Sequence, residues 1–316
     1  MSFKVFISGA TGFVGHHLID LLSPPEYEIY GTSFPDKPEK DDHYKGKNIS
    51  YLDIKSEEKV FETIKRIQPD WIFHLAAVSN VRHSWEKKRE TLETNLMGTF
   101  YLFEAVRKLL PQARILFISS SDVYGILVPT KRALKEEDSF HVVNPYAFTK
   151  VSGEILSKFY AEIENLDIII ARSFPHTGPG QHPDFVCSDW AYQIAQIEKG
   201  LAEPVIEVGN LNGRRDFTDV RDVVKAYALL LEKGRRGEVY NVCSGKAVAL
   251  REILDLLLSF SSQKIEVNVD SSKLRKADIP LLLGENRKVK KETSWKPEIP
   301  LKKSLSDLLE YWRKRV

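Results

Sequence analysis

Glycine occupies every third position of a short turn near the N-terminus, at Gly9, Gly12 and Gly15. Residues 3–8 before the turn alternate and include β-branched side chains, which predicts a strand, and residues 16–22 after it predict a helix. This order indicates a dinucleotide-binding fold, because glycine lets the backbone approach a pyrophosphate and a helix start offers unpaired N–H groups. The spacing is not the G-x-G-x-x-G of the dehydrogenase fingerprint, and a glycine turn alone is more often only a tight turn. In this context we expect a cofactor site formed by Gly9, Thr11, Gly12, Phe13, Val14 and Gly15.

Strands and helices alternate along the following residues. Apolar runs predict further strands at 27–33, 49–53, 71–76, 114–119, 167–173 and 238–243. Helical patterns between them cover 56–68, 90–110 and 145–163. This alternation predicts an α/β fold with a Rossmann-type doubly wound parallel sheet.

The length of 316 residues favours one large domain with a smaller one, because a single core rarely holds so many residues. We expect residues 1–172 and 215–245 to form an NAD(P)-binding Rossmann domain. Residues 173–214 and 246–316 are then a smaller C-terminal α/β substrate domain. Its predicted helices are 186–199, 250–260 and 304–315.

Charge and cysteine content exclude several classes of protein. With 46 basic and 44 acidic side chains the formal net charge is only +2, and no basic stretch indicates binding to nucleic acid. Cys187 and Cys243 lie far apart without metal-ligand spacing, so we expect two buried thiols, no metal site and no disulfide framework. No run reaches the ~18 apolar residues of a membrane helix, and residues 1–10 predict a strand rather than a signal peptide. These features favour a cytoplasmic protein with a small-molecule partner and no membrane contact.

A helix is predicted to begin at Asn144, a favoured N-cap residue, with Pro145 at the first helical position. Tyr146 and Lys150 lie four residues apart and therefore project from one side of this helix. A phenol has a pKa near ~10, and a neighbouring ammonium lowers that pKa toward neutral pH, where proton transfer is most effective. The same spacing also fits a solvated helix start. The apolar residues that follow are spaced to bury one helix face: Val151, Ile155, Phe159, Tyr160 and Ile163.

A serine run at 119–125 follows the strand predicted at 114–119. Serines after a strand are usually turn formers, but ligands of open α/β sheets bind beyond the carboxyl ends of the strands. The glycine turn, the serine run and the pair Tyr146 and Lys150 together resemble the extended short-chain dehydrogenase/reductase family of nucleotide-sugar epimerases, dehydratases and reductases. The resemblance covers nearly the whole chain and implies that Ser120, Tyr146 and Lys150 are catalytic.

The resemblance also implies contacts to a dinucleotide cofactor beyond the glycine turn. They come from Asp53 and Ile54 beside the adenine, Leu75, Ala76 and Ala77 on the nicotinamide side, Asn95 in the helix 90–110, and Tyr146 and Lys150. At the end of the second strand, where an acid would bind the ribose diol of NAD, the chain has Thr32 and Ser33. These hydroxyls accept either a ribose or a 2′-phosphate, and Lys37 lies in a nearby loop. We therefore expect NADPH to be modestly preferred and NADH to be accepted.

The C-terminal part resembles one branch of the family. Segments that look most like GDP-4-keto-6-deoxy-D-mannose reductases and their dehydratase relatives are 173–181, 208–217 and 275–280. This implies substrate contacts from Ser120, Asp122, Tyr146, Arg215, Arg275 and Asp278. The resemblance implies that Arg215 holds the substrate pyrophosphate, and a forked guanidinium suits such a group. One of the two residues Arg214 and Arg215 also fits a solvated loop. Pro175 replaces a frequent family asparagine, and His176 is expected to have only a structural role in its loop.

The resemblance implies reduction of the 4-keto group of GDP-4-keto-6-deoxy-D-mannose to GDP-6-deoxy-D-mannose (GDP-D-rhamnose), with hydride from NAD(P)H and Tyr146 as proton donor. Alternatives are a GDP-mannose 4,6-dehydratase or a nucleotide-sugar 4-epimerase. Family dehydratases have a glutamate where this chain has the shorter Asp122, which favours a reductase. An NAD(P)-sensing scaffold is a non-enzymatic alternative, disfavoured because the three catalytic residue types are present together.

A homodimer is also implied, through helices 90–110 and 145–163 packed as a four-helix bundle across a two-fold axis. Candidate apolar contacts are Tyr101, Phe103, Phe159 and Tyr160.

Overall fold

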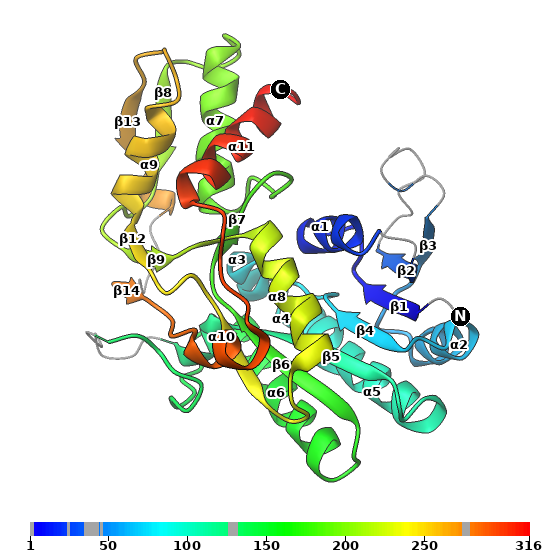
Figure 1. The fold of residues 1–316 in the computed structure, drawn as a ribbon. Coiled ribbons are helices and arrows are strands. Elements are labelled where there is room, and N and C mark those ends of the chain that lie inside the picture. The colour runs from blue at the N-terminus through cyan, green and yellow to red at the C-terminus, as the bar shows by residue number, and fades with distance from the viewer. Residues whose placement is uncertain (1–2, 24–25, 35–43, 45–46, 126–131, 274–278) are drawn as a thin grey trace.

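The computed structural model describes residues 3–23, 26–34, 44, 47–125, 132–273 and 279–316. Within these residues, a seven-stranded parallel sheet with the order β11-β6-β5-β4-β1-β2-β3 forms the centre of the larger lobe (Figure 1). Its strands are β1 (Phe3–Ser8), β2 (Tyr27–Ser33), β3 (Asn48–Tyr51), β4 (Trp71–His74), β5 (Arg114–Ser120), β6 (Asp167–Ser173) and β11 (Val239–Val242). The strand order reverses at β1, so the carboxyl ends of β1 and β4 border the switch point where such sheets bind ligands. The predicted fold class is confirmed.

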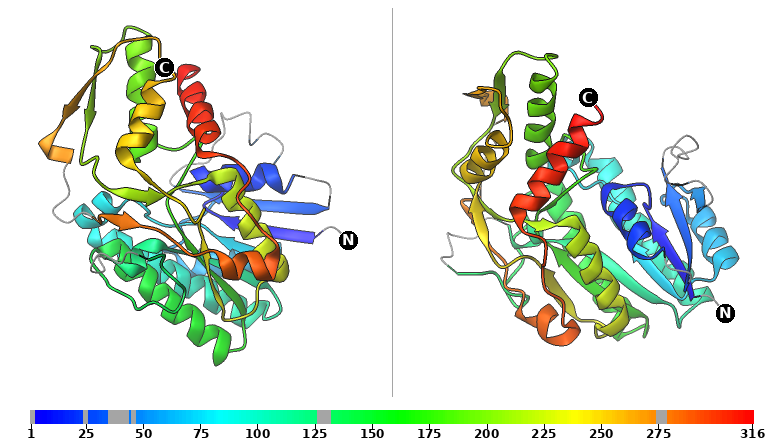
Figure 2. Two further views of the ribbon diagram at one scale, coloured as in Figure 1. Left: turned by 60° about the vertical axis from the view of Figure 1, so that its left-hand side comes forward. Right: turned by 45° about the horizontal axis from the view of Figure 1, so that its top comes forward.

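Helices cover both faces of the sheet, as Figures 1 and 2 show. Successive strand residues point to opposite faces, so Val5 and Ile7 belong to one apolar cluster and Phe6 to the other. The first face is covered by α1 (Phe13–Leu21), α8 (Val220–Lys233) and α10 (Arg287–Thr293). The second face is covered by α2 (Glu57–Ile67), α5 (Gly98–Leu109) and α6 (Pro145–Glu162).

The smaller lobe has its own apolar cluster. Its main elements are α7 (Val186–Glu198), β8 (Val205–Val208), α9 (Leu250–Leu258), β13 (Glu266–Val269) and α11 (Leu301–Arg313). The three predicted helices of this part are confirmed, with ends that differ by a few residues. Short strands join the lobes: β9 (Arg214–Asp216) pairs with β12 (Ala247–Ala249) and β14 (Leu281–Leu282), and β7 (His176–Thr177) pairs with β10 (Thr218–Asp219).

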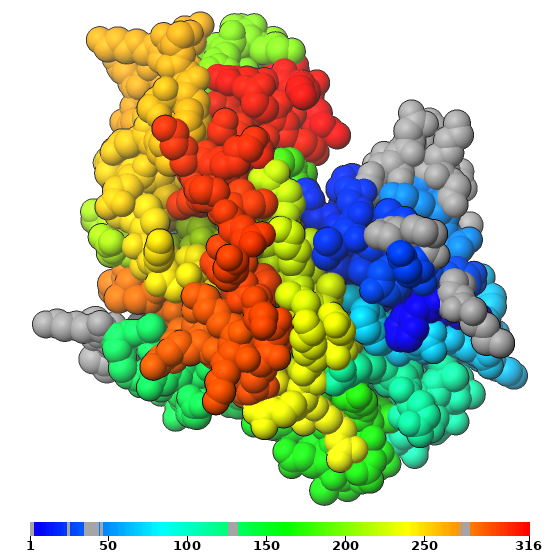
Figure 3. Space-filling model, in the orientation of Figure 1, coloured from blue at the N-terminus to red at the C-terminus, as the bar shows by residue number. Residues whose placement is uncertain are grey.

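One stretch predicted in the smaller domain packs on the larger lobe instead. Val289 and Trp295 belong to the apolar cluster on the first face of the sheet. Trp295 Nε1 donates a hydrogen bond to the backbone oxygen of Asp222 at 2.8 Å, and the Asp222 carboxylate accepts from the N–H groups of Glu298 and Ile299. In Figure 3 the orange and red atoms of this segment run beside the yellow atoms of α8. The predicted domain assignment is therefore wrong for residues 287–295, and the rest of the division stays a prediction.

Helix α6 begins as predicted, because the Asn144 side chain accepts a hydrogen bond from the Ala147 N–H at 2.7 Å. The predicted buried face is confirmed only for Val151 and Tyr160, since Ile155, Phe159 and Ile163 are 59%, 47% and 66% exposed. Small residues face the sheet instead, and a Cβ on Gly153 would lie only 2.4 Å from the Phe117 ring. The close approach of α6 to β5 requires a residue without a side chain at Gly153, whereas Ile155, Phe159 and Ile163 lie on the outer side.

The helix predicted at 90–110 is interrupted. It consists of α4 (Lys88–Leu92), a π-helical segment η2 (Glu93–Met97) and α5. The wider turn places Asn95 against other elements, where its side chain bonds to both backbone groups of Val78 and to Thr149 Oγ1. Tertiary hydrogen bonds therefore explain the interruption.

Cys187 and Cys243 are buried free thiols, as predicted. Among the helices that the structure describes, none has the length and apolar character needed to cross a bilayer.

Candidate active site

The glycine turn packs tightly between β1 and α1. Gly9 has φ +71°, and a Cβ there would lie 2.9 Å from the backbone nitrogen of Ala76. A Cβ on Gly15 would lie 2.5 Å from the backbone oxygen of Ala10, so this glycine is needed for close helix–strand packing. Gly12 is the N-cap of α1 and brings no side chain to its first N–H groups. The turn thus leaves a helix start open to an anionic ligand.

The end of β2 carries two buried hydroxyls. Thr32 Oγ1 accepts a hydrogen bond from the Gly9 N–H at 3.3 Å. Ser33 Oγ has no hydrogen-bond partner among the described residues, although the side chain is only 2% exposed. Because a buried polar group without a partner is unfavourable, this hydroxyl is suited to a polar ligand group. Lys37 lies outside the described residues.

The segments predicted beside the adenine and the nicotinamide border the same sheet edge. The Asp53 carboxylate accepts from the Lys55 N–H at 3.0 Å, and Ile54 is buried. Asp53 and Lys55 also line a cleft of about 400 Å³, together with Ser56, Glu93, Met97 and Tyr101. After β4, the Ala76 N–H donates to Ser8 Oγ at 3.2 Å, which fixes the segment that contains Leu75, Ala76 and Ala77.

Asn95 holds the chain that follows β4 by hydrogen bonds to Val78. Its Oδ1 accepts from the Val78 N–H at 2.7 Å, and its Nδ2 donates to the Val78 oxygen and to Thr149 Oγ1, each at 3.0 Å. These bonds join the chain after β4 to α6. Asn95 therefore positions these two elements, and its predicted contact with a cofactor stays a prediction.

The three predicted catalytic residues meet beyond the carboxyl end of β5. Ser120 caps the short helix η3 (Ser121–Tyr124), accepting a hydrogen bond at Oγ from the Asp122 N–H at 3.1 Å. A hydrogen bond joins the Ser120 and Tyr146 side chains. The Lys150 ammonium donates to the backbone oxygen of Ile118 at 2.7 Å and lies 5.8 Å from the centre of the Tyr146 ring. The structure therefore brings together residues that are 30 positions apart in the sequence.

The electrostatics of Tyr146 differ from the expectation. Burial raises the pKa of the Tyr146 phenol, the Asp122 carboxylate raises it further, and the hydrogen bond with Ser120 opposes both effects. Burial also lowers the pKa of the Lys150 ammonium to about 8. The predicted lowering of the phenol pKa by Lys150 is wrong for this structure, because desolvation dominates. A buried phenol of raised pKa remains protonated at neutral pH, which is the form that a proton donor needs, but it is a weaker acid than a phenol in water.

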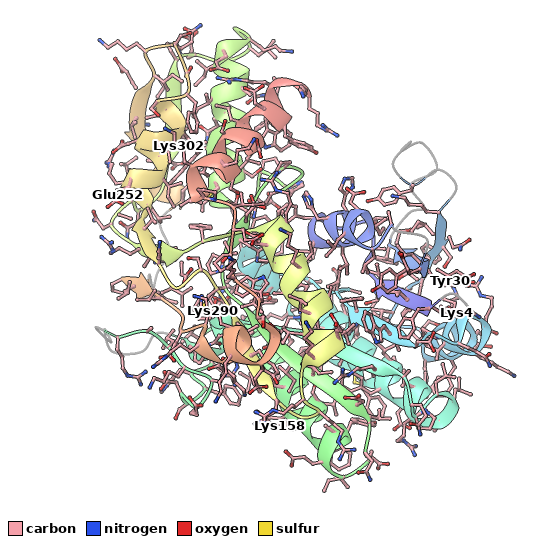
Figure 4. All side chains as sticks on the ribbon, in the orientation of Figure 1. Lys4, Tyr30, Lys158, Glu252, Lys290 and Lys302 are labelled. Carbon is pink, nitrogen blue, oxygen red and sulfur yellow. The ribbon has the colours of Figure 1, made fainter. Side chains whose placement is uncertain are left out.

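Arg215 lies on β9, at the junction of the two lobes. Its guanidinium donates to the backbone oxygens of Ile279 and Arg214 at 2.5 and 3.0 Å. Arg214 is the more exposed of the pair and lies 4.0 Å from Glu252 of α9, which Figure 4 labels in the smaller lobe. Arg275 and Asp278, the other predicted substrate residues, lie outside the described residues.

Asp216, next to Arg215, was not predicted as a functional residue. Its side chain is fully buried and accepts hydrogen bonds from the backbone N–H groups of Ser244, Gly245 and Gly284. Asp216 thus fixes two loops, at 244–245 and at 284, around the strand that carries Arg215. A single acid after two arginines gives no sequence signal for this role.

His176 was expected to have a structural role only within its own loop, but it also contacts the glycine turn. Its ring stacks on Phe13 of the glycine turn, with the ring centres 5.9 Å apart and an interplanar angle of 8°. His17 Nε2 lies 2.8 Å from the backbone oxygen of Pro179. These contacts attach the loop that enters the smaller lobe to the start of α1, next to the predicted cofactor site.

Known proteins resemble this chain over its whole length. The family model for GDP-mannose 4,6 dehydratase matches residues 6–308. GDP-6-deoxy-D-mannose reductase from Pseudomonas aeruginosa is 34% identical over 100% of this chain and 99% of its own length. GDP-mannose 4,6-dehydratase from Yersinia enterocolitica is 26% identical over 97% of this chain and 92% of its own length. The solved structure of RMD from Pseudomonas aeruginosa complexed with NADPH has a TM-score of 0.88 and 33% identity, covering 100% of both chains.

Proposed function

Because the chain belongs to the GDP-mannose 4,6-dehydratase family, within the extended short-chain dehydrogenases/reductases, we propose that it reduces GDP-4-keto-6-deoxy-D-mannose to GDP-6-deoxy-D-mannose. It is an NAD(P)H-dependent oxidoreductase that acts on a nucleotide-linked sugar. The observation that carries the proposal is the buried phenol of Tyr146, placed beside Ser120 and Lys150 at the carboxyl end of the sheet.

The residues present fit a bound NAD(P)H. The tight turn at Gly9 would hold the pyrophosphate against α1, and the unpartnered hydroxyl of Ser33 would bind the adenosine ribose or its 2′-phosphate. NAD(P)H held by these residues would supply the hydride for reduction of the sugar at C4. The end of β2 lacks a carboxylate that would repel a 2′-phosphate, which supports NADPH as the modestly preferred cofactor with NADH also accepted.

We propose four roles, which the positions of the side chains support. Ser120 hydrogen-bonds the substrate carbonyl oxygen, and Tyr146 donates its proton to that oxygen as C4 is reduced. Lys150 binds the nicotinamide ribose and holds positive charge beside the phenol. Arg215 holds the substrate diphosphate with a forked guanidinium.

A GDP-mannose 4,6-dehydratase remains the main alternative, with a 4-epimerase as a second. A dehydratase needs a carboxylate that reaches the sugar at C5 and C6. Asp122 is one methylene shorter than the glutamate of family dehydratases and reaches less far, which supports the reductase. Incubation with GDP-mannose and cofactor alone separates these activities, because only a dehydratase releases water and forms the 4-keto sugar.

The central experiment measures NADPH oxidation with GDP-4-keto-6-deoxy-D-mannose and identifies the product by NMR. We expect GDP-6-deoxy-D-mannose from the wild-type protein. A Tyr146→Phe variant is expected to lose about 10²- to 10⁴-fold in kcat while binding NADPH normally. Normal turnover by this variant contradicts the catalytic assignment. Absence of turnover with any nucleotide-linked 4-keto sugar revives the non-enzymatic scaffold.

We also propose a homodimer formed through α6 and the helix that contains η2. The outer face of α6 exposes Phe148, Ile155 and Phe159, followed by the exposed C-cap residue Ile163, and η2 exposes Met97. Two of the candidates from the sequence, Phe103 and Tyr160, lie in the core of their own subunit and are wrong as contacts. A continuous exposed apolar face on one helix supports association with a second copy.

A cytoplasmic location is proposed as well. The buried free thiols Cys187 and Cys243 are typical of a reducing compartment.

A further inference from the structure

A buried ion pair lies behind the catalytic residues and has no part in the proposed mechanism. Glu154 of α6 is 0% exposed and Arg172 of β6 is 2% exposed. The guanidinium donates to the carboxylate from Nε at 2.9 Å and from Nη2 at 2.8 Å. Because a buried ion pair loses much of its attraction to desolvation, stability alone is a weak explanation for it.

The pair binds the chain on both sides of Ser120. Glu154 Oε1 accepts a hydrogen bond from Ser119 Oγ at 2.5 Å, and Ser119 directly precedes Ser120. Arg172 Nη1 donates to the Tyr124 hydroxyl at 2.9 Å, at the end of the helix that Ser120 caps. Two contacts, one before and one after, therefore restrict the position of the Ser120 hydroxyl.

The same pair belongs to the helix that carries the proton donor. Glu154 lies one turn after Lys150 and two turns after Tyr146, so the three residues share one side of α6. We propose that Glu154, held by Arg172, is a positioning residue that aligns Ser120 with Tyr146 and Lys150. This inference rests on the proposed catalytic roles of those three residues.

Glu154 also acts on the charge of Lys150. Its carboxylate raises the pKa of the Lys150 ammonium, against the larger lowering by burial. Other titratable groups around Lys150 and Tyr146 come from three elements: His74 of β4, which burial keeps neutral, Asp122 of η3 and Tyr227 of α8. Removing the Glu154 charge is therefore expected to lower the pKa of Lys150.

Two variants separate the geometric effect from the electrostatic one. Ser119→Ala removes one hydrogen bond and keeps every charge, so we expect kcat to fall about 10- to 100-fold, with unchanged NADPH affinity and an unchanged alkaline limb of kcat/KM. Glu154→Gln keeps the shape and removes the charge. For this variant we expect a lower kcat and an alkaline limb displaced to lower pH.

Asp222→Asn serves as the matched control. Asp222 is an equally buried carboxylate that accepts hydrogen bonds from two backbone N–H groups near the C-terminus and from the Lys225 ammonium. None of these partners belongs to the predicted catalytic residues, so this variant is expected to lose stability without moving the alkaline limb. NADPH affinity, measured by calorimetry for each variant, reports on the fold of the cofactor site independently of turnover.

The outcomes distinguish this inference from the proposed function. A wild-type kcat in Ser119→Ala overturns the geometric role of Glu154. This test holds even if the Glu154→Gln variant does not fold. The electrostatic role is overturned if the alkaline limb of kcat/KM moves no further in Glu154→Gln than it does in Asp222→Asn. Inactivity of Tyr146→Phe in the same assays leaves the proposed function standing, whereas its full activity refutes that function.

Discussion

Replacing Gly153 by alanine is expected to disturb catalysis more than stability. The new Cβ would lie 2.4 Å from Cζ of Phe117, more than 1 Å inside the ordinary carbon–carbon separation of roughly 3.5–4.0 Å. Phe117 is buried, and the Lys150 ammonium lies 5.3 Å from the centre of its ring. Relief of the clash therefore moves either the helix with Tyr146 and Lys150, or the ring beside Lys150.

The two expected effects differ in size. Overpacking a core costs about 1–3 kcal/mol, and alanine in place of glycine inside a helix returns about 1 kcal/mol. The free energy of unfolding is thus expected to fall by roughly 0–2 kcal/mol. A displacement of about 1 Å at reacting groups costs about 100-fold in rate, which equals about 2.7 kcal/mol of activation free energy.

The assay combines urea unfolding with kcat and KM for the 4-keto sugar. Lys158→Ala is the control, because Lys158 lies on the exposed side of the same helix (Figure 4) and its loss is expected to change stability by less than about 0.5 kcal/mol. Wild-type kcat and wild-type stability in Gly153→Ala would refute the close packing of α6 on β5.

Ser33→Asp is expected to reverse the cofactor preference, because a carboxylate at the end of β2 binds a ribose diol and repels a 2′-phosphate; a kcat/KM ratio that still favours NADPH contradicts this. Burial lowers the pKa of Lys150 to about 8, so its ammonium loses the proton as the pH rises and kcat/KM should fall above about pH 8. Lys150→Arg, although slower, should lack this alkaline limb because arginine stays charged. Phe159→Glu places a charge on the exposed apolar face of α6 and should give a monomer by light scattering; an unchanged mass in solution shows that this face does not mediate association.

Local signals in the sequence were sufficient for the parts of the site that depend on neighbouring residues. The cap at Asn144 is formed with the nearby Ala147 N–H, and the turn at Gly9 has the positive φ that glycine tolerates; both are observed. The exposed face of α6 was not predictable in this way, because helical spacing marks an apolar face without telling whether it meets the sheet or the surface.

Features that depend on distant partners could not be predicted. The π-helical segment exists where Asn95 bonds to Val78 and Thr149, 17 and 54 residues away. The buried pair of Glu154 and Arg172 joins two elements whose contact follows only from the assembled sheet. The periodicity of a single sequence predicts helices and strands, but it does not predict which distant residues come into contact.

The placement of α10 has a consequence for how the chain folds during synthesis. Val289 and Trp295 complete the apolar cluster that covers Val5 and Ile7 on the first face of the sheet. A ribosome makes β1 first and α10 almost last, so part of that face stays uncovered until most of the protein has emerged. Nascent chains therefore expose strand surface for most of translation, which is the stage when binding by chaperones protects such chains from aggregation.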